Sequence, residues 1–201
     1  IEAAPAQLLK SIDDYLHVEF PVAAKLVSPN LPHKANVGCV VLDITNISQL
    51  EAAVQKLRER ADQLCLGAGN TGILVQHMEQ GVAEVLIGYR ENLETGPIVI
   101  CGLGGTFAEH YRDLAVRLAP VSQVTASAMI KEAFYRVYIG GSNFEGVADS
   151  PALANAIVSL SNLAGIGKSR IAEAEINPLI VKEHEKGVLA VDGLIVLGKA
   201  D

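Results

Sequence analysis

Two apolar segments rich in β-branched residues flank a short polar tetrad near the end of the chain. The segments cover residues 171–181 and 188–196, and the tetrad is residues 183–186. Strand-like segments joined by a short polar loop predict a β-hairpin. With the tetrad as the loop, the pairing register places Asn177 directly opposite Asp192.

Oxygen-bearing side chains share one face of the first of these strands. Alternate residues of a strand point the same way, so Glu173, Glu175 and Asn177 project together. Asp192 joins them, because cross-strand partners share a face with Cβ atoms about 5 Å apart. Carboxylate and amide oxygens suit Mg²⁺, whose other positions take water and substrate phosphates. The alternative is a solvated polar face, but Asp192 lies within an apolar segment, where burying a carboxylate is costly.

Periodicity and turn residues divide the rest of the chain into strands and helices. Strands are predicted at residues 21–27, 37–42, 72–78, 83–90 and 97–101. Helices are predicted from a capping box at Ser48 to Gly67, from Ser150 to Gly165, and more weakly at residues 6–16 and 127–138. This order of elements indicates an α+β fold rather than repeated βαβ units, with a lobe boundary near residues 67–72.

Composition narrows the class of protein. The 201 residues are 50% hydrophobic but only 4% aromatic, without Trp, so the core is expected to be aliphatic. An aliphatic core suits sheets covered by helices. A net charge of −7 without clustered Lys and Arg argues against a nucleic-acid partner.

The cysteines and the apolar runs bear on the compartment. Cys39, Cys65 and Cys101 are far apart and form no CxxC pair, so neither a disulfide framework nor a zinc site is expected, and a reducing cytoplasm fits. The apolar runs fall short of the ~20 residues that span a bilayer, so we expect no membrane partner. The chain opens with Ile1 rather than Met, so we expect it to be a fragment of a longer protein, and no signal-peptide pattern is present.

Four further features carry possible chemistry. Lys25 lies in an apolar strand, where it either binds a phosphate or protects a sheet edge. His33 lies in a loop, as a phosphoryl acceptor or simply solvated. The glycines of residues 102–105 follow a strand and offer backbone N–H groups, or form only a tight turn. Glu84 is either an acceptor for a sugar hydroxyl or an exposed strand residue.

Together these segments resemble the ATP-grasp domain of NDP-forming (ADP-forming) acyl-CoA synthetases, the β-type subunit of acetyl-CoA synthetase, and more distantly the β subunit of succinyl-CoA synthetase. The resemblance covers nearly the whole chain. Its carriers are residues 20–25, 28–34, 75–78, 84–88, 96–97, 102–105, Glu109, Asp113, 117–120, 175–178 and 192–193.

The resemblance implies an ATP-grasp fold of two α/β lobes, at residues 1–70 and 71–201, with mixed or antiparallel sheets. The first lobe is shorter before Lys25 than the family pattern, so we expect it to be truncated. The implied nucleotide-binding residues are Lys25 at the phosphates, Gln76 and Met78 at the adenine, Glu84 at the ribose, and Gly104 and Gly105 in the glycine-rich turn.

The same resemblance implies roles in catalysis and metal binding. Asn177 and Asp192 would hold Mg²⁺, and Glu175 would lie behind them or beside the phosphoryl acceptor. His33 matches the loop histidine that carries phosphate to the nucleotide site. The implied reaction converts acyl-CoA, ADP and phosphate to the acid, CoA and ATP through acyl phosphate and phosphohistidine intermediates. CoA-binding and CoA-ligase domains would be partners, and this fragment alone is expected to be inactive.

Several positions depart from the family pattern. Ala35, Asn36 and Cys39 replace residues of the histidine loop, Thr95 replaces a Phe, and residues 141–143 replace an Arg-Gly pair. The altered loop and the missing arginine favour a rival function, in which the domain is a non-catalytic nucleotide sensor or structural part of a synthetase-like or acyltransferase fusion. The presence of Lys25, His33, Asn177 and Asp192 opposes it. A third possibility is a scaffold that binds no nucleotide.

Overall fold

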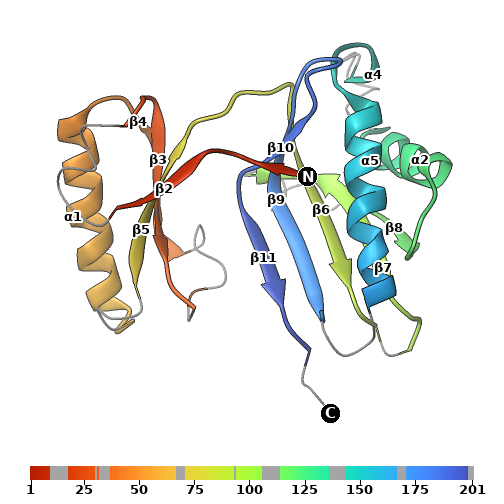
Figure 1. Ribbon diagram of the computed structural model, residues 1–201, viewed down its shortest axis with the longest axis horizontal. Coiled ribbons are helices and arrows are strands. Elements are labelled where there is room, and N and C mark those ends of the chain that lie inside the picture. Colours follow the sequence, from red (N-terminus) through yellow and green to blue (C-terminus); the bar gives the residue numbers. More distant parts are fainter. Residues whose placement is uncertain are drawn as a thin grey trace. The chain divides into compact units, whose positions relative to one another are not determined.

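The computed structural model describes residues 1–9, 18–29, 31, 37–66, 71–92, 94–105, 114–135, 144–166 and 171–198. The chain forms two compact units (Figure 1), one of residues Ala4–Glu79 and one of residues Ile1–Ala3 and Gln80–Asp201. The division lies beyond the boundary that we expected at 70/71, because the strand that begins at Gly72 is interior to the sheet of the smaller unit.

The smaller unit is an antiparallel sheet with one long helix. Its strand order is β2 (Ala6–Leu9), β5 (Gly72–His77), β3 (Val22–Val27) and β4 (Val40–Ile44). Helix α1 (Ile47–Gln63) covers one face of this sheet (Figure 1). The predicted apolar spacing is confirmed, since Leu50, Val54, Leu57 and Ala61 are all buried against the sheet.

Helix α1 begins earlier than the capping box at Ser48 predicts, so that prediction is wrong. Asn46 is the N-cap, and its Oδ1 accepts from the Gln49 N–H at 3.0 Å. The Gln49 side chain reaches back to the Thr45 N–H at 2.8 Å. The N–H groups of Gln49 and Thr45 are therefore satisfied by a reciprocal pair of side chains, those of Asn46 and Gln49, and Ser48 is not the cap.

The predicted helix at residues 6–16 is also wrong over the part that the structure describes. Residues Ala6–Leu9 form the edge strand β2, which pairs antiparallel with β5 from Ala6 opposite Gln76 to Leu9 opposite Ile73. Pairing with β5 supplies the backbone hydrogen bonds of this short segment, so tertiary structure overrides its helical pattern.

The larger unit is a sheet in the order β1–β10–β9–β6–β7–β8, with β11 also paired to β9. Among the strands that the structure describes in this unit, only β1 and β10 pair in parallel. The strands are β1 (Glu2–Ala3), β6 (Ala83–Arg90), β7 (Ile98–Leu103), β8 (Leu114–Leu118), β9 (Glu173–Val181), β10 (Val188–Ala190) and β11 (Gly193–Val196).

Helices cover one face of this sheet (Figure 1). They are α2 (Gln123–Ala133), the short α4 (Phe144–Val147) and α5 (Ser150–Ser161), which continues as a 3-10 turn at Asn162–Ile166. The start of α5 at Ser150 is confirmed, whereas α2 begins before the predicted residue 127 because Ser122 Oγ caps it at the Thr125 N–H. No helix in the described part of the chain is long and apolar enough to cross a membrane.

The helix-covered face of the larger sheet leaves the opposite face for polar groups. Val85, Ile87 and Tyr89 of β6 are buried in the core beneath the helices, so Glu84 and Gly88 point to the other side.

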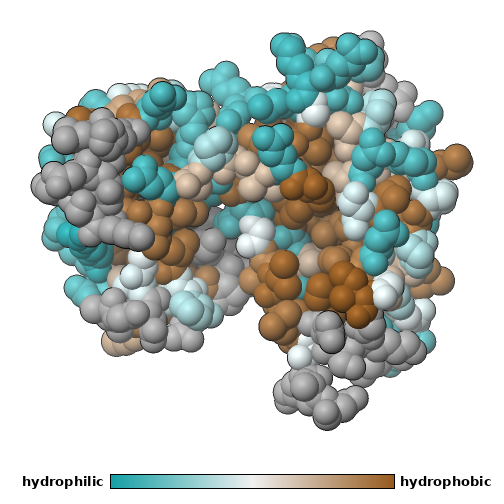
Figure 2. Space-filling view, viewed as in Figure 1, coloured by the Kyte–Doolittle hydropathy of each residue, from teal (hydrophilic) through white to brown (hydrophobic). Residues whose placement is uncertain are grey.

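At the end of β11 the side chains of Ile195, Val196 and Leu197 are exposed by 64%, 40% and 73%. Figure 2 shows hydrophobic side chains gathered there.

Candidate functional site

The hairpin register predicted from the sequence is confirmed. Val188 of β10 pairs with Val181 of β9, and Gly193 of β11 pairs with Ile176 of β9. Between these pairs the Asn177 N–H donates to the Asp192 carbonyl at 3.0 Å. The returning strand is interrupted at residues 191–192, so the predicted strand 188–196 is two short strands in one register.

A β-bulge lies at the centre of the candidate site. Strand β6 pairs with β9 in one register up to Val85 and in another from Ile87, so Leu86 alone faces Asn177 and Pro178. The extra residue lies in β9, so β9 bends there and its alternation of inward and outward side chains shifts by one. The acidic residues of β9 before the bulge and its apolar residues after the bulge can therefore belong to one strand without exposing the core.

Three segments meet at a turn that follows β7. The Gly104 N–H donates to the Glu84 carbonyl at 2.9 Å, and the Gly105 N–H donates to Asn177 Oδ1 at 3.0 Å. Gly105 has φ +61°, and a Cβ built on it would lie 1.6 Å from Glu84 Oε2. We call Glu84, Gly104, Gly105 and Asn177 the glycine-turn cluster. The sequence shows the glycine motif and the Asn177 motif separately, but nothing in it indicates that Gly105 and Asn177 are in contact.

Asn177 and Asp192 offer the donor chemistry of a magnesium site. One supplies an amide oxygen and the other carboxylate oxygens, of which Asp192 Oδ1 accepts from the Gly193 N–H at 2.9 Å. Within the described ranges, no three His, Cys, Asp or Glu side chains are arranged to hold a metal ion. Mg²⁺ is commonly held by one or two protein oxygens together with water and nucleotide phosphates, so these two residues fit that ion.

Glu175 lies one step along the same strand face from Asn177. It pairs with Leu194 of β11 on one side and with Gly88 of β6 on the other. Gly88 is buried, and the Ile100 side chain fills the space where a Cβ on Gly88 would lie, at 2.8 Å. Glu175 itself is half-buried, on the same strand face as Asn177.

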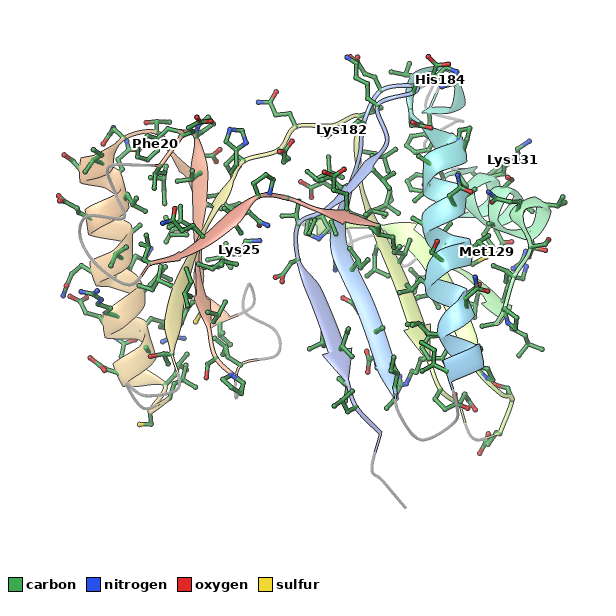
Figure 3. The ribbon with its side chains drawn as sticks, in the orientation of Figure 1. Phe20, Lys25, Met129, Lys131, Lys182 and His184 are labelled. Carbon is green, nitrogen blue, oxygen red and sulfur yellow. The ribbon has the colours of Figure 1, made fainter. Side chains whose placement is uncertain are left out.

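Two further candidate residues meet within the smaller unit. Lys25 Nζ donates to Gln76 Oε1 at 2.6 Å, and the two residues are only 4% and 5% exposed. Gln76 Nε2 in turn donates to the Ala4 carbonyl at 3.3 Å, and the Met78 N–H donates to the Pro21 carbonyl at 2.9 Å. Figure 3 labels Lys25 on β3.

The position of β3 in the sheet bears on the two alternatives for Lys25, phosphate binding and protection of a sheet edge. Strand β3 lies between β5 and β4, so Lys25 is not on a sheet edge and the edge-protection alternative is wrong. A buried ammonium group in a central strand needs polar partners, and the Gln76 amide oxygen is one of them.

The candidate residues therefore form two sets, one in each unit. The larger unit brings together the glycine-turn cluster, Asp192 and Glu175, and the smaller unit brings together Lys25 and Gln76 with Met78 nearby in the chain. His33 lies outside the described residues, as do the departures at Ala35, Asn36 and 141–143.

Cys101, which precedes the glycine turn in β7, is not a nucleophile of this site. Its side chain is fully buried in the core, and burial raises the pKa of its thiol to about 12. The thiolate, which is the reactive form, is therefore not populated near neutral pH.

Comparisons with known proteins identify the family of the chain. A model of the ATP-grasp domain family matches residues 3–197. The acetate–CoA ligase [ADP-forming] II subunit beta of Pyrococcus furiosus is 31% identical over 195 residues, which are 95% of this chain and 83% of that protein. The acetate–CoA ligase [ADP-forming] I of Archaeoglobus fulgidus is 31% identical over 99% of this chain, which spans only 29% of that longer protein.

A solved structure shows the same fold. The dinucleotide-forming acetyl-coenzyme A synthetase 1 of Ca. Korarchaeum cryptofilum, in complex with coenzyme A and Mg-AMPPCP, superposes with a TM-score of 0.75 at 30% identity over 98% of this chain and 85% of that one. The chain belongs to the ATP-grasp domain family, in the group that includes the β subunits of ADP-forming acetate–CoA ligases.

Proposed function

We propose that this domain binds ADP or ATP with Mg²⁺ and moves a phosphoryl group between the nucleotide and a phosphohistidine, as part of an ADP-forming acid–CoA ligase. The overall reaction would be acyl-CoA, ADP and phosphate to acid, CoA and ATP. The observation that carries this proposal is the glycine-turn cluster, with Asp192 paired opposite Asn177 through the backbone. The cluster brings carboxylate and amide oxygens from separate segments to one turn.

The larger unit would supply the metal end and the sugar end of the nucleotide site. Asn177 and Asp192 would hold Mg²⁺, which neutralises phosphate charge during transfer. The Glu84 carboxylate would accept hydrogen bonds from ribose hydroxyls, and the Gly104–Gly105 turn would bring backbone close to the ligand. Glu175, next to Asn177 on the strand face, would orient the metal ligands or the phosphoryl acceptor.

The smaller unit would supply the remaining contacts. Lys25 would give up part of its interaction with Gln76 to reach the phosphates, because an ammonium group gains more from an anion than from an amide oxygen. The segment from Gln76 to Met78 would meet the adenine. His33 would carry the phosphoryl group, since a neutral imidazole is a competent nucleophile near pH 7.

The related structure supports this scheme. It was solved with Mg-AMPPCP and with its phosphohistidine segment pointing towards the nucleotide-binding site. Because the chain spans 29% of the Archaeoglobus ligase, the complete reaction would also need CoA-binding and CoA-ligase domains, in the same polypeptide or in another subunit.

The proposal is tested by phosphoryl labelling. The full-length protein that contains this chain is incubated with γ-labelled ATP and Mg²⁺, and the protein is assayed for acid-labile, base-stable label. We expect label that the substitution His33→Ala removes. Label that persists in His33→Ala would assign the acceptor to another residue and contradict the role of His33.

Binding measured alongside separates the rival function. A folded protein that binds Mg-ATP but takes no label is a nucleotide sensor, and the catalytic proposal fails. A protein with neither label nor a thermal shift in Mg-ATP or Mg-ADP is a scaffold. Glu183→Gln is the matched control, because this exposed carboxylate lies on the same hairpin but pairs with Lys186 at the loop.

A further inference from the structure

The Gly104–Gly105 turn is held on two sides by groups from different strands. The Gly104 N–H is bonded to the backbone of Glu84 at 2.9 Å, and the Gly105 N–H to the side chain of Asn177 at 3.0 Å. The turn is thus a bridge from β6 to the bulge of β9. The residues at its two ends are Glu84, which is assigned above to the ribose, and Asn177, which is assigned above to the metal ion.

The hydrogen bond from Gly105 fixes the orientation of the Asn177 carboxamide. A backbone N–H can only donate, so the oxygen of Asn177, and not its NH₂ group, faces the turn. The same oxygen keeps a second lone pair, which a cation could take. Groups that hold a metal ligand in this way commonly change metal affinity by about 10- to 100-fold when they are removed.

The missing side chain at residue 105 leaves the space that the Glu84 carboxylate occupies. Glu84 Oε2 occupies the space where a Cβ on Gly105 would lie, at 1.6 Å. The clashing atom is the end of a flexible side chain, so an alanine at 105 would move the carboxylate rather than break the sheet. At Gly104 the opposite holds, because its Cβ would meet the Val85 backbone at 2.6 Å.

We propose that Gly105 is a positioning residue that serves both ends of the nucleotide site: its N–H orients Asn177 as a metal ligand, and its missing side chain lets Glu84 lie where a sugar hydroxyl can be bound. This inference rests on the proposed function. It adds that metal binding and sugar recognition both depend on one turn.

The first test compares Gly105→Ala with Gly96→Ala. Both glycines have positive φ, +61° and +87°, but a Cβ on Gly96 meets nothing within 4 Å, so only Gly105→Ala adds the clash with Glu84. The dissociation constants of ADP and of 2′,3′-dideoxy-ADP are measured with Mn²⁺ as a metal probe, together with Mn²⁺ affinity by paramagnetic resonance.

We expect the wild type and Gly96→Ala to prefer ADP over the dideoxy analogue. Gly105→Ala would lose most of that preference, because its Cβ displaces the Glu84 carboxylate. It keeps the N–H that donates to Asn177, so its Mn²⁺ affinity in the nucleotide complex should fall by less than about 10-fold. A folded Gly105→Ala protein that keeps the wild-type preference for ADP overturns the inference. A wild type that binds neither nucleotide contradicts the proposed function instead.

The second test uses the metal ligands themselves and keeps the inference testable if Gly105→Ala does not fold. Asn177→Ala and Asp192→Ala each remove a metal ligand, but only Asn177→Ala releases the turn. We expect faster amide hydrogen exchange at Gly105 in ligand-free Asn177→Ala, normal exchange in Asp192→Ala, and recovery in Asn177→Asp, which keeps an acceptor oxygen. Equal exchange in the two alanine variants would show that Asn177 does not hold the turn.

Discussion

Cys65 has a left-handed backbone, with φ +54°, just after helix α1 ends. The Cys65 N–H donates to the Asp62 carbonyl at 3.0 Å, and the Leu66 N–H donates to the Ala61 carbonyl at 3.2 Å. This pair of bonds is the Schellman pattern, whose left-handed position is usually glycine. The helix therefore ends before the predicted stop at Gly67, with a cysteine in the place that glycine favours.

Replacing Cys65 by glycine should stabilise the protein. Relief of the left-handed strain, about 1 to 2 kcal/mol, is partly offset by the greater freedom of glycine in the unfolded chain, so the expected gain is about 0.5 to 1 kcal/mol. Urea unfolding of Cys65→Gly measures it. Cys65→Ala keeps the strained backbone and should stay near wild type; an equal gain in both variants would assign the effect to the lost thiol.

The three thiols should differ sharply in reactivity. Cys65 is exposed, whereas Cys39 and Cys101 are fully buried and burial raises the pKa of both thiols. An aromatic disulfide reagent at neutral pH should modify Cys65 rapidly and the other two only on unfolding. Rapid modification of the folded Cys65→Ala protein would contradict the burial of the other two.

Alkaline pH should destabilise the fold through Tyr89. Burial, and then the hydrogen bond to Glu91, raise the pKa of Tyr89 from 10.0 to about 12. Between these values the unfolded chain loses the phenolic proton and the folded chain keeps it, so stability falls as pH rises from about 10 to 12. The loss between pH 9 and 11 should be smaller in Tyr89→Phe; an unchanged pH slope would count against this assignment.

At the scale of elements, the loop end of the hairpin is attached to helix α5 by one buried carboxylate. Asp149, 6% exposed, accepts from the Ala152 N–H at 3.1 Å as the N-cap of α5 and from the Gly187 N–H at 2.8 Å. The His184 N–H also donates to the Val147 carbonyl at 2.9 Å. Figure 3 shows Lys182 and His184 at this end of the hairpin.

Removing the Asp149 carboxylate should lower the free energy of unfolding by more than removing an ordinary helix cap does. A helix cap contributes about 1 kcal/mol and a hydrogen bond to a charged group about 1.5 to 3, so Asp149→Ala should lose about 2 to 4 kcal/mol of unfolding free energy. Asp149→Asn should lose less, because it keeps one acceptor. Chemical denaturation measures both variants, and a loss below about 1 kcal/mol for Asp149→Ala would contradict the double role.

Local pattern was sufficient for some elements and not for others. Strand β6 and the hairpin register follow from alternation and loop length alone, and both are confirmed. Strand β8 was missed because its large residues Leu114, Val116 and Leu118 are exposed, while the small Ala115 is buried. The bulge at Asn177 and Pro178 depends on pairing with β6, a distant segment that no local pattern specifies.

The candidate site shows the same limit. Motif spacing suggested Glu84, Gly105 and Asn177 separately, but their mutual contact arises only when β6, the glycine turn and β9 pack together. Lys25 was recognised as anomalous because it lies in an apolar strand, and its hydrogen bond with Gln76 depends on the pairing of β3 with β5.

At the scale of the whole molecule, two units each contribute one set of candidate residues, and the family to which the chain belongs binds nucleotide. Binding to the folded state alone stabilises it by mass action, by about 2.7 kcal/mol at a ligand concentration of 100 times Kd. Mg-ADP should therefore raise the unfolding midpoint. ADP with excess EDTA should raise it much less, and equal shifts would exclude a metal-dependent site.

Titration calorimetry of the full chain with ADP in Mg²⁺, with Asp192→Ala and Glu183→Gln measured beside the wild type, tests whether the domain binds nucleotide through a metal ion. We expect saturable binding by the wild type and Glu183→Gln, and binding at least tenfold weaker in Asp192→Ala or when EDTA replaces Mg²⁺. Wild-type binding that neither EDTA nor Asp192→Ala weakens, or no binding by the wild type at all, would contradict this expectation.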